Sequence, residues 1–302
     1  MKRMKTTLLL PLVLVTAFEV SVFAEGEQEI QKTFSQSSEV RLKLVLGECE
    51  IGPSSDGKIH VELAYAYSRG GFEPILKERS RYLLLQEKFH GTNPEGHSRW
   101  TLAVPDGIEI AFSSATGDLT VAGLAADLTG STGTGDLNLD KVKGNLHLRT
   151  GTGRVQVLDS EGDFELSSGT GRVTVRGFKG NIEASSGTAD VHVSEVNLES
   201  DGEFSSGTGD AEVVFPGVGD FELSVSSGTG SAVVKMDGQP LQGHFEFTCQ
   251  AKRGRIVCPE KFDKEEAYTD HETKYLVKSF TRGEDASKTR VSTGTGEAKL
   301  TK

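Results

Sequence analysis

Long stretches of the chain alternate apolar and polar residues with a period of two, which predicts β-strands with one buried face. Between residues 119 and 235 the alternating apolar pairs are Leu119/Val121, Leu137/Leu139, Val155/Val157, Val173/Val175, Val191/Val193, Ala211/Val213 and Ala232/Val234. In many units a second alternating pair follows a turn, as in Leu146/Leu148. Each unit therefore predicts a strand, a turn, a second strand and another turn.

A Gly-Thr-Gly motif, once written Gly-Thr-Ala, marks every second turn and sets the period of the repeat. Its first glycine recurs every 18 residues up to position 187 and then after 20 and 21 residues. The glycines of this turn ladder are Gly133, Gly151, Gly169, Gly187, Gly207 and Gly228. Because a tight corner needs backbone of positive φ, which glycine adopts freely, we expect positive φ at these positions. The neighbouring Ser and Thr residues are expected to form ladders of hydroxyl groups.

A single unit cannot bury its apolar face, because an isolated pair of strands is only marginally stable in water. Stacking the units about 4.8 Å apart places like residues in columns and buries them between two faces. We therefore predict an all-β fold, a β-helix-like β-solenoid with two-strand coils of about 18 residues. The alternative is a sandwich of antiparallel hairpins, which also alternates. The solenoid is favoured because hairpins have no reason to keep one motif at every second turn only.

The regularity of the repeat divides the chain into regions. Residues 25–38 are polar and are predicted to be a loose leader. Residues 39–105 alternate without the Gly-Thr-Gly motif and predict a β cap at the N-terminal end of the stack. Residues 106–302 are predicted to form the solenoid, with an irregular excursion at about 248–286. The chain is then expected to re-enter the stack at Val291–Leu300 and to close its far end.

The first 24 residues have the pattern of a secretory signal peptide. A basic start with Lys2, Arg3 and Lys5 precedes an apolar run, and Val22-Phe23-Ala24 suits a signal peptidase. The apolar run is shorter than the 20 or so residues that a transmembrane helix needs. We therefore expect cleavage after Ala24, no membrane span in the mature chain, and an exported protein that is periplasmic, on the cell surface or secreted.

The charge balance argues against a nucleic-acid partner. Lys and Arg number 33 against 44 Asp and Glu, so the formal net charge is −11. A chain this acidic has no overall field that would hold DNA or RNA. The composition also includes 36 glycines among regular Val and Leu positions, which is not the pattern of a disordered chain.

The three cysteines suggest one disulfide in an exported chain. Cys249 and Cys258 flank a basic segment and are candidates for a disulfide across a hairpin, with two free thiols as the alternative. Its tip would carry Lys252, Arg253 and Arg255, which either contact an anionic envelope polymer or form a solvated turn. Cys49 is left over and is expected to be buried.

None of the motifs predicts a catalytic residue, a cofactor or a metal site. The Gly-Thr-Gly turns are not followed by the lysine or the helix of a phosphate-binding loop. Calcium-binding repeats are disfavoured, although Asp118, Asp136, Asp190 and Asp210 share a column, because Arg154 and Arg172 occupy the same column. An ice-binding face is disfavoured as well, since serine replaces threonine in the later turns. No nucleophile elbow is present, and a set of carboxylates for polysaccharide cleavage cannot be chosen.

The repeats resemble a known family. Val104-Pro105-Asp106-Gly107, the Ser-Gly-Thr-Gly-Asp units that follow, and the final Ser292-Thr293-Gly294-Thr295-Gly296 look like the bacterial adhesin-like, or toast-rack (DUF4097-like), β-strand-repeat domain. The likeness covers about residues 34–302, with an interruption between about 236 and 286. It implies an envelope-exposed, all-β, solenoid-like scaffold, and the family supplies no catalytic residues.

Two classes of function follow from these observations. We expect a non-enzymatic exported envelope protein, an adhesin-like scaffold or binding module that contacts an envelope glycan or a protein along a rigid flank. The alternative is a polysaccharide-acting enzyme with its groove along the stack. The resemblance alone suggests a third role, a periplasmic partner of an envelope signalling system.

Overall fold

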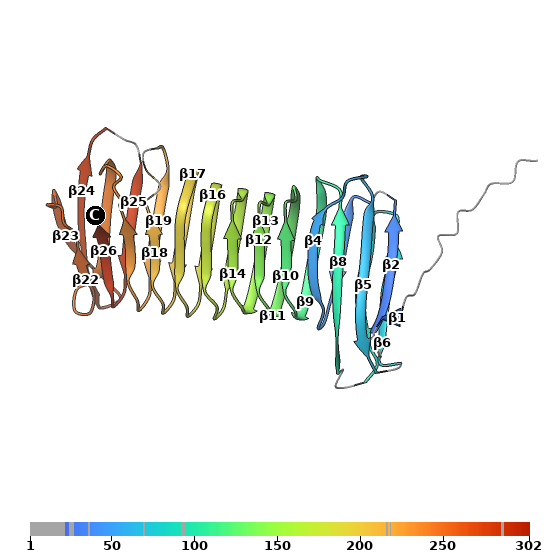
Figure 1. Ribbon diagram of the computed structural model, residues 1–302. Coiled ribbons are helices and arrows are strands. Elements are labelled where there is room, and N and C mark those ends of the chain that lie inside the picture. The colour runs from blue at the N-terminus through green and yellow to red at the C-terminus, as the bar shows by residue number, and fades with distance from the viewer. Residues whose placement is uncertain are drawn as a thin grey trace, which may run out of the picture.

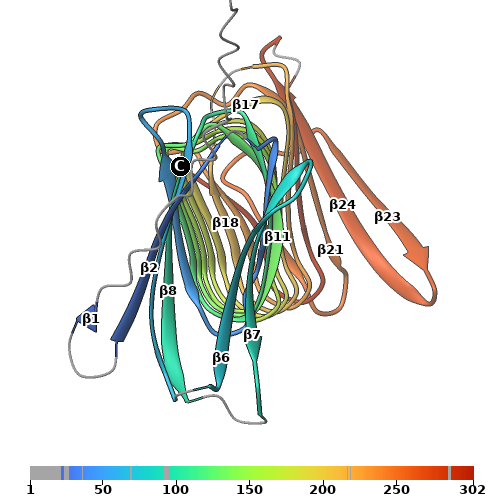
Figure 2. The same ribbon diagram turned by 90° about the vertical axis from the view of Figure 1, so that its right-hand side faces the viewer.

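The structure is a computed structural model that describes residues 22–23, 27–35, 37–68, 70–91, 95–215, 217, 219–284 and 287–302. Its strands stand side by side in one long stack (Figure 1), and the view along the stack shows two faces joined at corners (Figure 2). No helix among the described residues is long and apolar enough to cross a membrane. Apart from the strand β1 (Val22–Phe23), the predicted signal peptide lies outside the described residues and stays a prediction.

The first of the two faces is called here the β11 face. Its strands, in spatial order, are β6 (Phe72–Glu78), β7 (Tyr82–Phe89), β3 (Glu39–Lys43), β9 (Ile108–Thr116), β11 (Ala126–Thr134), β13 (Lys143–Thr152), β15 (Glu161–Ser168), the second halves of β16 (Val173–Ser186) and β17 (Val191–Ser206), β19 (Glu222–Ser227), β25 (Lys288–Thr293), β21 (Gly243–Gln250), β24 (Thr273–Arg282) and β23 (Lys264–Asp270).

The second face is called the β12 face. It begins with β1 and continues through β2 (Glu27–Phe34), β5 (Ile59–Tyr67), β8 (Gly96–Val104), β4 (Glu48–Pro53), β10 (Leu119–Ala122), β12 (Leu137–Asp140), β14 (Val155–Leu158), the first halves of β16 and β17, β18 (Ala211–Val214), β20 (Ala232–Lys235), β26 (Glu297–Thr301) and β22 (Arg255–Val257).

Parallel strands in matching register build the middle of the stack. On the β12 face Leu137 pairs with Val155, and Val155 pairs with Val173. On the β11 face Leu146 pairs with Phe164. All of these side chains are buried, so the apolar columns of the two faces form one continuous core. The predicted β-solenoid is thereby confirmed, because antiparallel hairpins would not place equivalent residues of successive repeats side by side.

The corners hold the glycine ladder, but for a different reason than expected. None of its six glycines has positive φ. Their place excludes a side chain, because a Cβ on Gly151 would lie 2.6 Å from the carbonyl oxygen of Gly133 in the preceding coil. Left-handed backbone lies at the opposite corner instead, at positions such as Lys141 (φ 54°) and Gly177 (φ 68°). The expectation of positive φ at the ladder is therefore wrong, and close stacking of the coils explains these glycines.

A buried hydroxyl column accompanies each of these corners. The Ser168 hydroxyl donates to the Gly153 carbonyl of the preceding coil (2.7 Å) and accepts from the Gly171 amide (2.8 Å). Thr150 and Ser186 make the same inter-coil bond, to Gly135 and Gly171. Each hydroxyl thus satisfies backbone groups that the corner takes out of the strand ladder.

The first and last coils of the chain lie inside the stack, one coil away from its ends. The coil β3–β4 lies between β7–β8 and β9–β10, and the coil β25–β26 lies between β19–β20 and β21–β22. The re-entering segment therefore does not close the far end. The earlier coil β21–β22 covers it, and the antiparallel strands β24 and β23 complete the β11 face.

Two other regional predictions are corrected by these pairings. The polar leader contains a strand, β2, which pairs with β5 and buries Ile30 and Phe34. The excursion at about 248–286 is not irregular, because β21 and β22 pair in parallel with the last coil, and β23 and β24 form a regular antiparallel hairpin. In both places a few apolar residues at strand spacing were enough to hold a mainly polar segment in the sheet.

Candidate functional site

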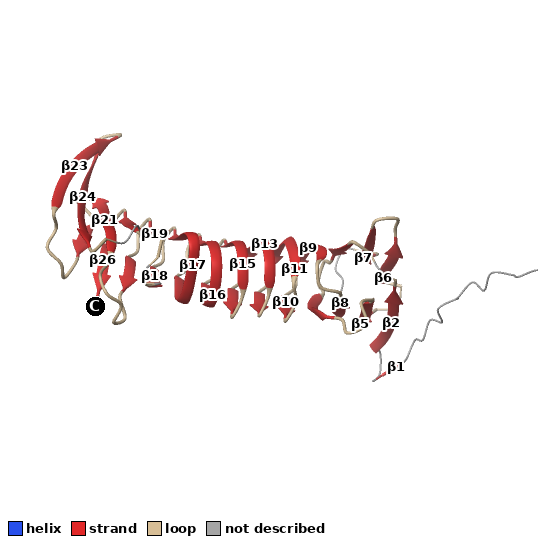
Figure 3. Ribbon diagram, turned by 90° about the horizontal axis from the view of Figure 1, so that it is seen from above, coloured by secondary structure: helices blue, strands red, loops and turns tan. Residues whose placement is uncertain are grey.

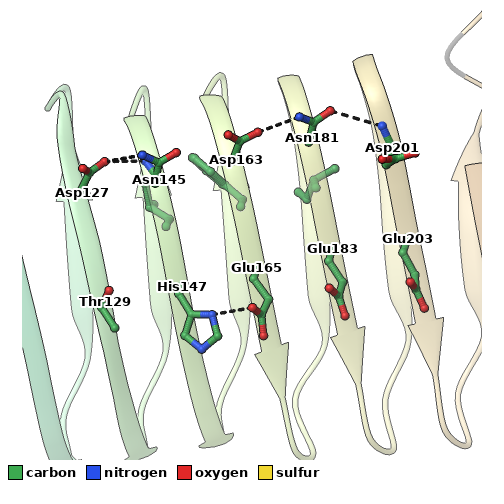
Figure 4. Close-up of a pocket in the computed structure, with 13 residues that line it drawn as sticks. Asp127, Thr129, Asn145, His147, Asp163, Glu165, Asn181, Glu183, Asp201 and Glu203 are labelled. Atoms are coloured by element: carbon green, nitrogen blue, oxygen red, sulfur yellow. Dashed lines mark hydrogen bonds and ion pairs between the residues drawn. The ribbon is translucent and has the colours of Figure 1, made fainter. Parts of the chain in front are cut away.

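A shallow polar groove runs along the β11 face across β11, β13, β15, β16 and β17. It has a volume of about 520 Å³. Two rows of polar side chains point into it from neighbouring strands (Figure 4). The side chains and backbone that line the groove belong to Asp127, Thr129, Asn145, Leu146, His147, Asp163, Phe164, Glu165, Asn181, Ile182, Glu183, Asp201 and Glu203. Because parallel strands keep equivalent coil positions aligned, each row repeats at the inter-strand spacing.

The upper row alternates aspartate and asparagine. Its members, strand by strand, are Asp127, Asn145, Asp163, Asn181 and Asp201. The Asn145 side-chain amide donates to Asp127 Oδ1 (3.0 Å), and that of Asn181 donates to Asp163 Oδ1 (2.8 Å). Asn181 Oδ1 accepts from the Asp201 backbone amide (3.3 Å). Each asparagine therefore bridges to a neighbouring aspartate and holds the row in a fixed orientation (Figure 4).

The lower row becomes increasingly acidic along the stack. It consists of Thr129, His147, Glu165, Glu183 and Glu203. Glu165 lies 2.6 Å from His147 Nδ1 and 2.6 Å from Arg149 Nη2, and the Arg149 hydrogen bond, followed by His147, lowers its pKa. Within the described part of the chain, Glu183 and Glu203 are exposed and have no hydrogen-bond or ion-pair partner. The groove thus has one end where Glu165 is paired with Arg149 and His147, and an open end with free carboxylates.

The groove has the chemistry of a hydrogen-bonding surface. Carboxylates accept, amides both donate and accept, and a neutral histidine does one with each ring nitrogen. Among the described residues, no group of three or more His, Cys, Asp or Glu side chains is arranged to hold a metal ion. The arrangement suits a ligand rich in hydroxyl or amide groups.

A second groove on the β12 face is already occupied by ion pairs. Its volume is about 460 Å³, and it lies over β16, β17 and β18. Arg172 contacts Asp190 (3.0 Å), and Glu212 contacts both Lys235 (2.6 Å) and His192 (3.1 Å). These charged side chains pair with one another, so the β12 face offers a ligand fewer unpaired polar groups than the β11 face.

The column that had suggested calcium belongs to this second face. Asp136 accepts from the Arg154 backbone amide (2.7 Å) and pairs with its guanidinium (2.7 Å). Partial burial would raise the pKa of Asp136, but these two contacts with Arg154 hold it below its usual value. The Asp136 carboxylate therefore already pairs with a cation of the protein, the Arg154 guanidinium.

The predicted site residues all lie away from the groove of the β11 face. The turn-ladder glycines Gly133, Gly151, Gly169, Gly187, Gly207 and Gly228 occupy the corners. Lys252 and Arg253 are exposed in the corner between β21 and β22, and Arg255 begins β22 and pairs with Glu297. The basic tip exists, but it is a solenoid corner and not the tip of a hairpin.

The disulfide predicted between Cys249 and Cys258 is not formed in the structure, where both thiols are free. The reason is topological: Cys249 lies near the end of β21 on the β11 face, whereas Cys258 follows β22 on the β12 face. Burial raises the pKa of both thiols. Cys49 is buried, and desolvation raises the pKa of its thiol.

The two polar rows of the groove were not predicted from the sequence. The signal was present, because Asp127, Asn145, Asp163 and Asn181 recur at the 18-residue period. It is weak within any one strand, where a single polar residue on the outer face is ordinary. The rows become visible only when all coils are aligned and the outward positions are compared column by column.

Several solved structures are similar to this chain at low sequence identity. A candidate cell adhesion protein of Clostridium sporogenes shares 10% identity over 91% of this chain and 99% of its own, with a TM-score of 0.26. A candidate lipid-binding protein of Parabacteroides distasonis shares 12% identity over 70% of this chain and 90% of its own (TM-score 0.47). For a candidate adhesin of Parabacteroides merdae the values are 11%, 70% and 89% (TM-score 0.39).

No curated protein sequence is significantly similar to the chain. A family model, by contrast, matches most of it. The model describes the Toastrack DUF4097 domain and covers residues 35–252, from the strands of the N-terminal end to the outermost C-terminal coil. The chain belongs to the Toastrack DUF4097 family.

Proposed function

We propose that the protein is an exported, non-enzymatic, adhesin-like binding module of the cell envelope, and that the groove on the β11 face binds an extended glycan. Export rests on the signal peptide predicted at residues 1–24 and is tested by the cellular fraction that contains the protein. The polar side chains of the groove indicate the class of ligand.

One observation carries the glycan assignment: the alternation of aspartate and asparagine along the upper row. Asp127, Asp163 and Asp201 are each two strands apart, so the row repeats every 9 to 10 Å or so, twice the inter-strand spacing. A β-1,4-linked glycan repeats every two sugars, which is a translation of similar length. Successive disaccharides can therefore meet the same pair of side chains.

The charge of the groove narrows the class further. Three aspartates and three glutamates line it, against one histidine and the nearby Arg149. Anionic polymers would be repelled by this surface, whereas neutral or amino-bearing sugars would be accepted. Fixed carboxylate and amide groups lose little conformational entropy when they bind hydroxyl groups, because the ladder already orients them.

The test is retention of the purified protein on insoluble glycans. We expect retention on chitin, cellulose or chitosan beads without release of soluble fragments, and no retention on immobilised hyaluronan. Replacing Asn145 and Asn181 together by alanine should weaken retention at least about tenfold. The double variant loses two side chains that can each donate and accept a hydrogen bond. The matched control is Asn138→Ala on the β12 face, which should bind as the unmodified chain does. Equal retention of both variants would contradict the groove assignment.

A specific pair of carboxylates favours one alternative, a glycan-cleaving enzyme. Glu183 pairs in register with Glu203 on the next strand, and both are free of ion pairs in the part of the chain that the structure describes. Glycoside hydrolases use two carboxylates on either side of the bond they cleave. Shortening of chitin or cellulose chains, lost in Glu183→Gln and Glu203→Gln, would establish this activity and exclude a pure binding module.

A further inference from the structure

The strand β23 leaves one edge of the β11 face open at the C-terminal end. Among the described strands it pairs with β24 alone, and all seven of its residues are exposed. Figures 2 and 3 show the β23–β24 hairpin at the outer end of the stack, with β23 as its outer strand. Its residues are Lys264, Glu265, Glu266, Ala267, Tyr268, Thr269 and Asp270, with neither proline nor glycine. Such an edge is a template for a further strand unless something blocks it.

The geometry of the hairpin shows which backbone groups of β23 are available. The two-residue turn at His271 and Glu272 has φ of 41° and 67°, which indicates a type I′ turn, so Asp270 and Thr273 exchange hydrogen bonds. In agreement, the Ala251 amide donates to the Lys274 carbonyl (2.8 Å), so Lys274 faces β21. Every second residue of β23 therefore bonds to β24. The backbone groups of Glu265, Ala267 and Thr269 point to the open edge.

We propose that this edge pairs with the same strand of a second copy of the chain. An antiparallel pairing about a two-fold axis at Ala267 uses the three residues whose backbone groups point outwards. It places Lys264 opposite Asp270 of the second copy, and Asp270 opposite Lys264 of the second copy. No like charges face each other, because Glu265 meets Thr269 and Glu266 meets Tyr268. The strand is thus complementary to itself, as a two-fold interface requires.

Tyr268 adds an apolar contact to the pairing. It is 50% exposed, the one exposed large hydrophobic side chain among the described residues, and stacks on Tyr275 at a centroid distance of 5.1 Å. In the proposed register Tyr268 lies diagonally across from Tyr268 of the second copy, within reach of an aromatic side chain. The pairing would join the tyrosines of both copies in one cluster and cover this surface.

Sedimentation velocity of the full chain over a range of concentrations tests the proposal. We expect a reversible dimer that is weakened by salt, with dissociation constants on the order of 10–100 μM for so small an interface. Ala267→Pro should abolish it, because the proline removes an amide that points to the open edge but leaves the bonds between β23 and β24. Unchanged circular dichroism will show that this variant folds. A chain that stays monomeric, or a dimer that survives Ala267→Pro, overturns the proposal.

Exchanging the charges of Lys264 and Asp270 distinguishes the predicted register from other modes of dimerisation. Lys264→Asp and Asp270→Lys should each weaken dimerisation about tenfold, because each places like charges opposite one another twice. The double variant restores opposite charges and should return the dissociation constant to within about a factor of two. A double variant as weak as the single ones would show that these residues do not face each other.

Discussion

The two ends of the solenoid are covered in a similar way by unrelated residues. At each end the terminal coil of the chain is covered by one further coil, and antiparallel strands come last: β6 on one face and β5, β2 and β1 on the other at the N-terminal end, and β24 and β23 on the β11 face at the C-terminal end. A parallel stack leaves unpaired backbone groups at both ends, where other chains can add. Burying the terminal coils protects them from fraying. The similarity shows that the ends are specified by topology more than by any shared motif.

The interiors of the two ends differ in kind. The N-terminal end is organised around a buried carboxylate, Glu87, which accepts from the backbone amides of residues 45–47 (2.7, 3.0 and 3.2 Å). It also accepts from the Trp100 indole (2.9 Å) and from the Ser98 hydroxyl. The C-terminal end is organised around packed rings, with the Phe280 ring centroid 5.0 Å from that of Phe245 and 6.2 Å from that of Phe262. Both ends contain packed rings, but among the described residues Glu87 is the one buried charged side chain, and it belongs to the N-terminal end.

The largest effect is expected for Glu87→Ala. Five donors would lose their acceptor in a buried place, so the free energy of unfolding should fall by about 4 kcal/mol or more. Chemical denaturation measures the loss, and hydrogen exchange should locate it in β3, β4, β7 and β8. Glu62→Ala, at an exposed position of β5, is the matched control and should change stability by less than about 0.5 kcal/mol. A small effect of Glu87→Ala would mean that the N-terminal end does not depend on this carboxylate.

A somewhat smaller effect is expected for Phe280→Ala at the other end. The ring is fully buried, and its removal leaves a cavity among Phe245, Phe247 and Phe262, which should cost about 3–4 kcal/mol. Because each coil contacts only its neighbours, hydrogen exchange should accelerate in β21 and β24 and stay unchanged in β5 and β8. Faster exchange at both ends would show that the ends are coupled through the stack.

The difference between regular coils and ends also decides what can be predicted from the sequence. In the coils, the alternation and the 18-residue period place Val155 next to Val173 without further information, and the fold was predicted correctly. At the C-terminal end the order of the coils was not predictable. The segment at Val291 pairs with Phe247 on one side and Val225 on the other, and neither alternation nor composition distinguishes this order from a simple continuation.

The same limit explains the other errors. Cys249 and Cys258 are close in sequence, and a hairpin between them is the simplest local reading, but a corner of the solenoid separates them. Glu87 gave no signal, because a lone glutamate in an alternating strand looks like a surface residue. Its partners come from residues 45–47, 98 and 100, which only the folded end brings together.

The open edges of the two ends differ through one residue, Pro74. It lies in β6, the edge strand of the β11 face at the N-terminal end, at a position whose amide would point outwards, because Arg79 and Tyr82 form the bonded pair at the turn. Pro74→Thr should therefore create a second edge strand that can pair with another chain, and sedimentation velocity should then detect assemblies larger than a dimer. The strand is otherwise suited to self-pairing, since Glu73 would face Lys77 of a second copy. Unaltered sedimentation would show that Pro74 is not what blocks this edge.

The smallest effect concerns acid stability at the C-terminal hairpin. Asp263 accepts from the Thr281 amide (3.0 Å) and from Arg282 (2.8 Å), and these contacts lower its pKa, the Thr281 amide most. A carboxylate whose pKa is lowered on folding stabilises the protein above its ordinary pKa, and this contribution disappears as the pH falls through the lowered value. Asp263→Asn should therefore make hydrogen exchange in β23 and β24 faster at pH 7 and should not change it at pH 2.

Glu73 allows the matched experiment at the N-terminal end, because its contacts with Lys88 and then His90 lower its pKa. Glu73→Gln should change hydrogen exchange in β6 and β7 alone. If Asp263→Asn had the same effect at both pH values, the contribution of Asp263 to the C-terminal hairpin would not depend on its charge.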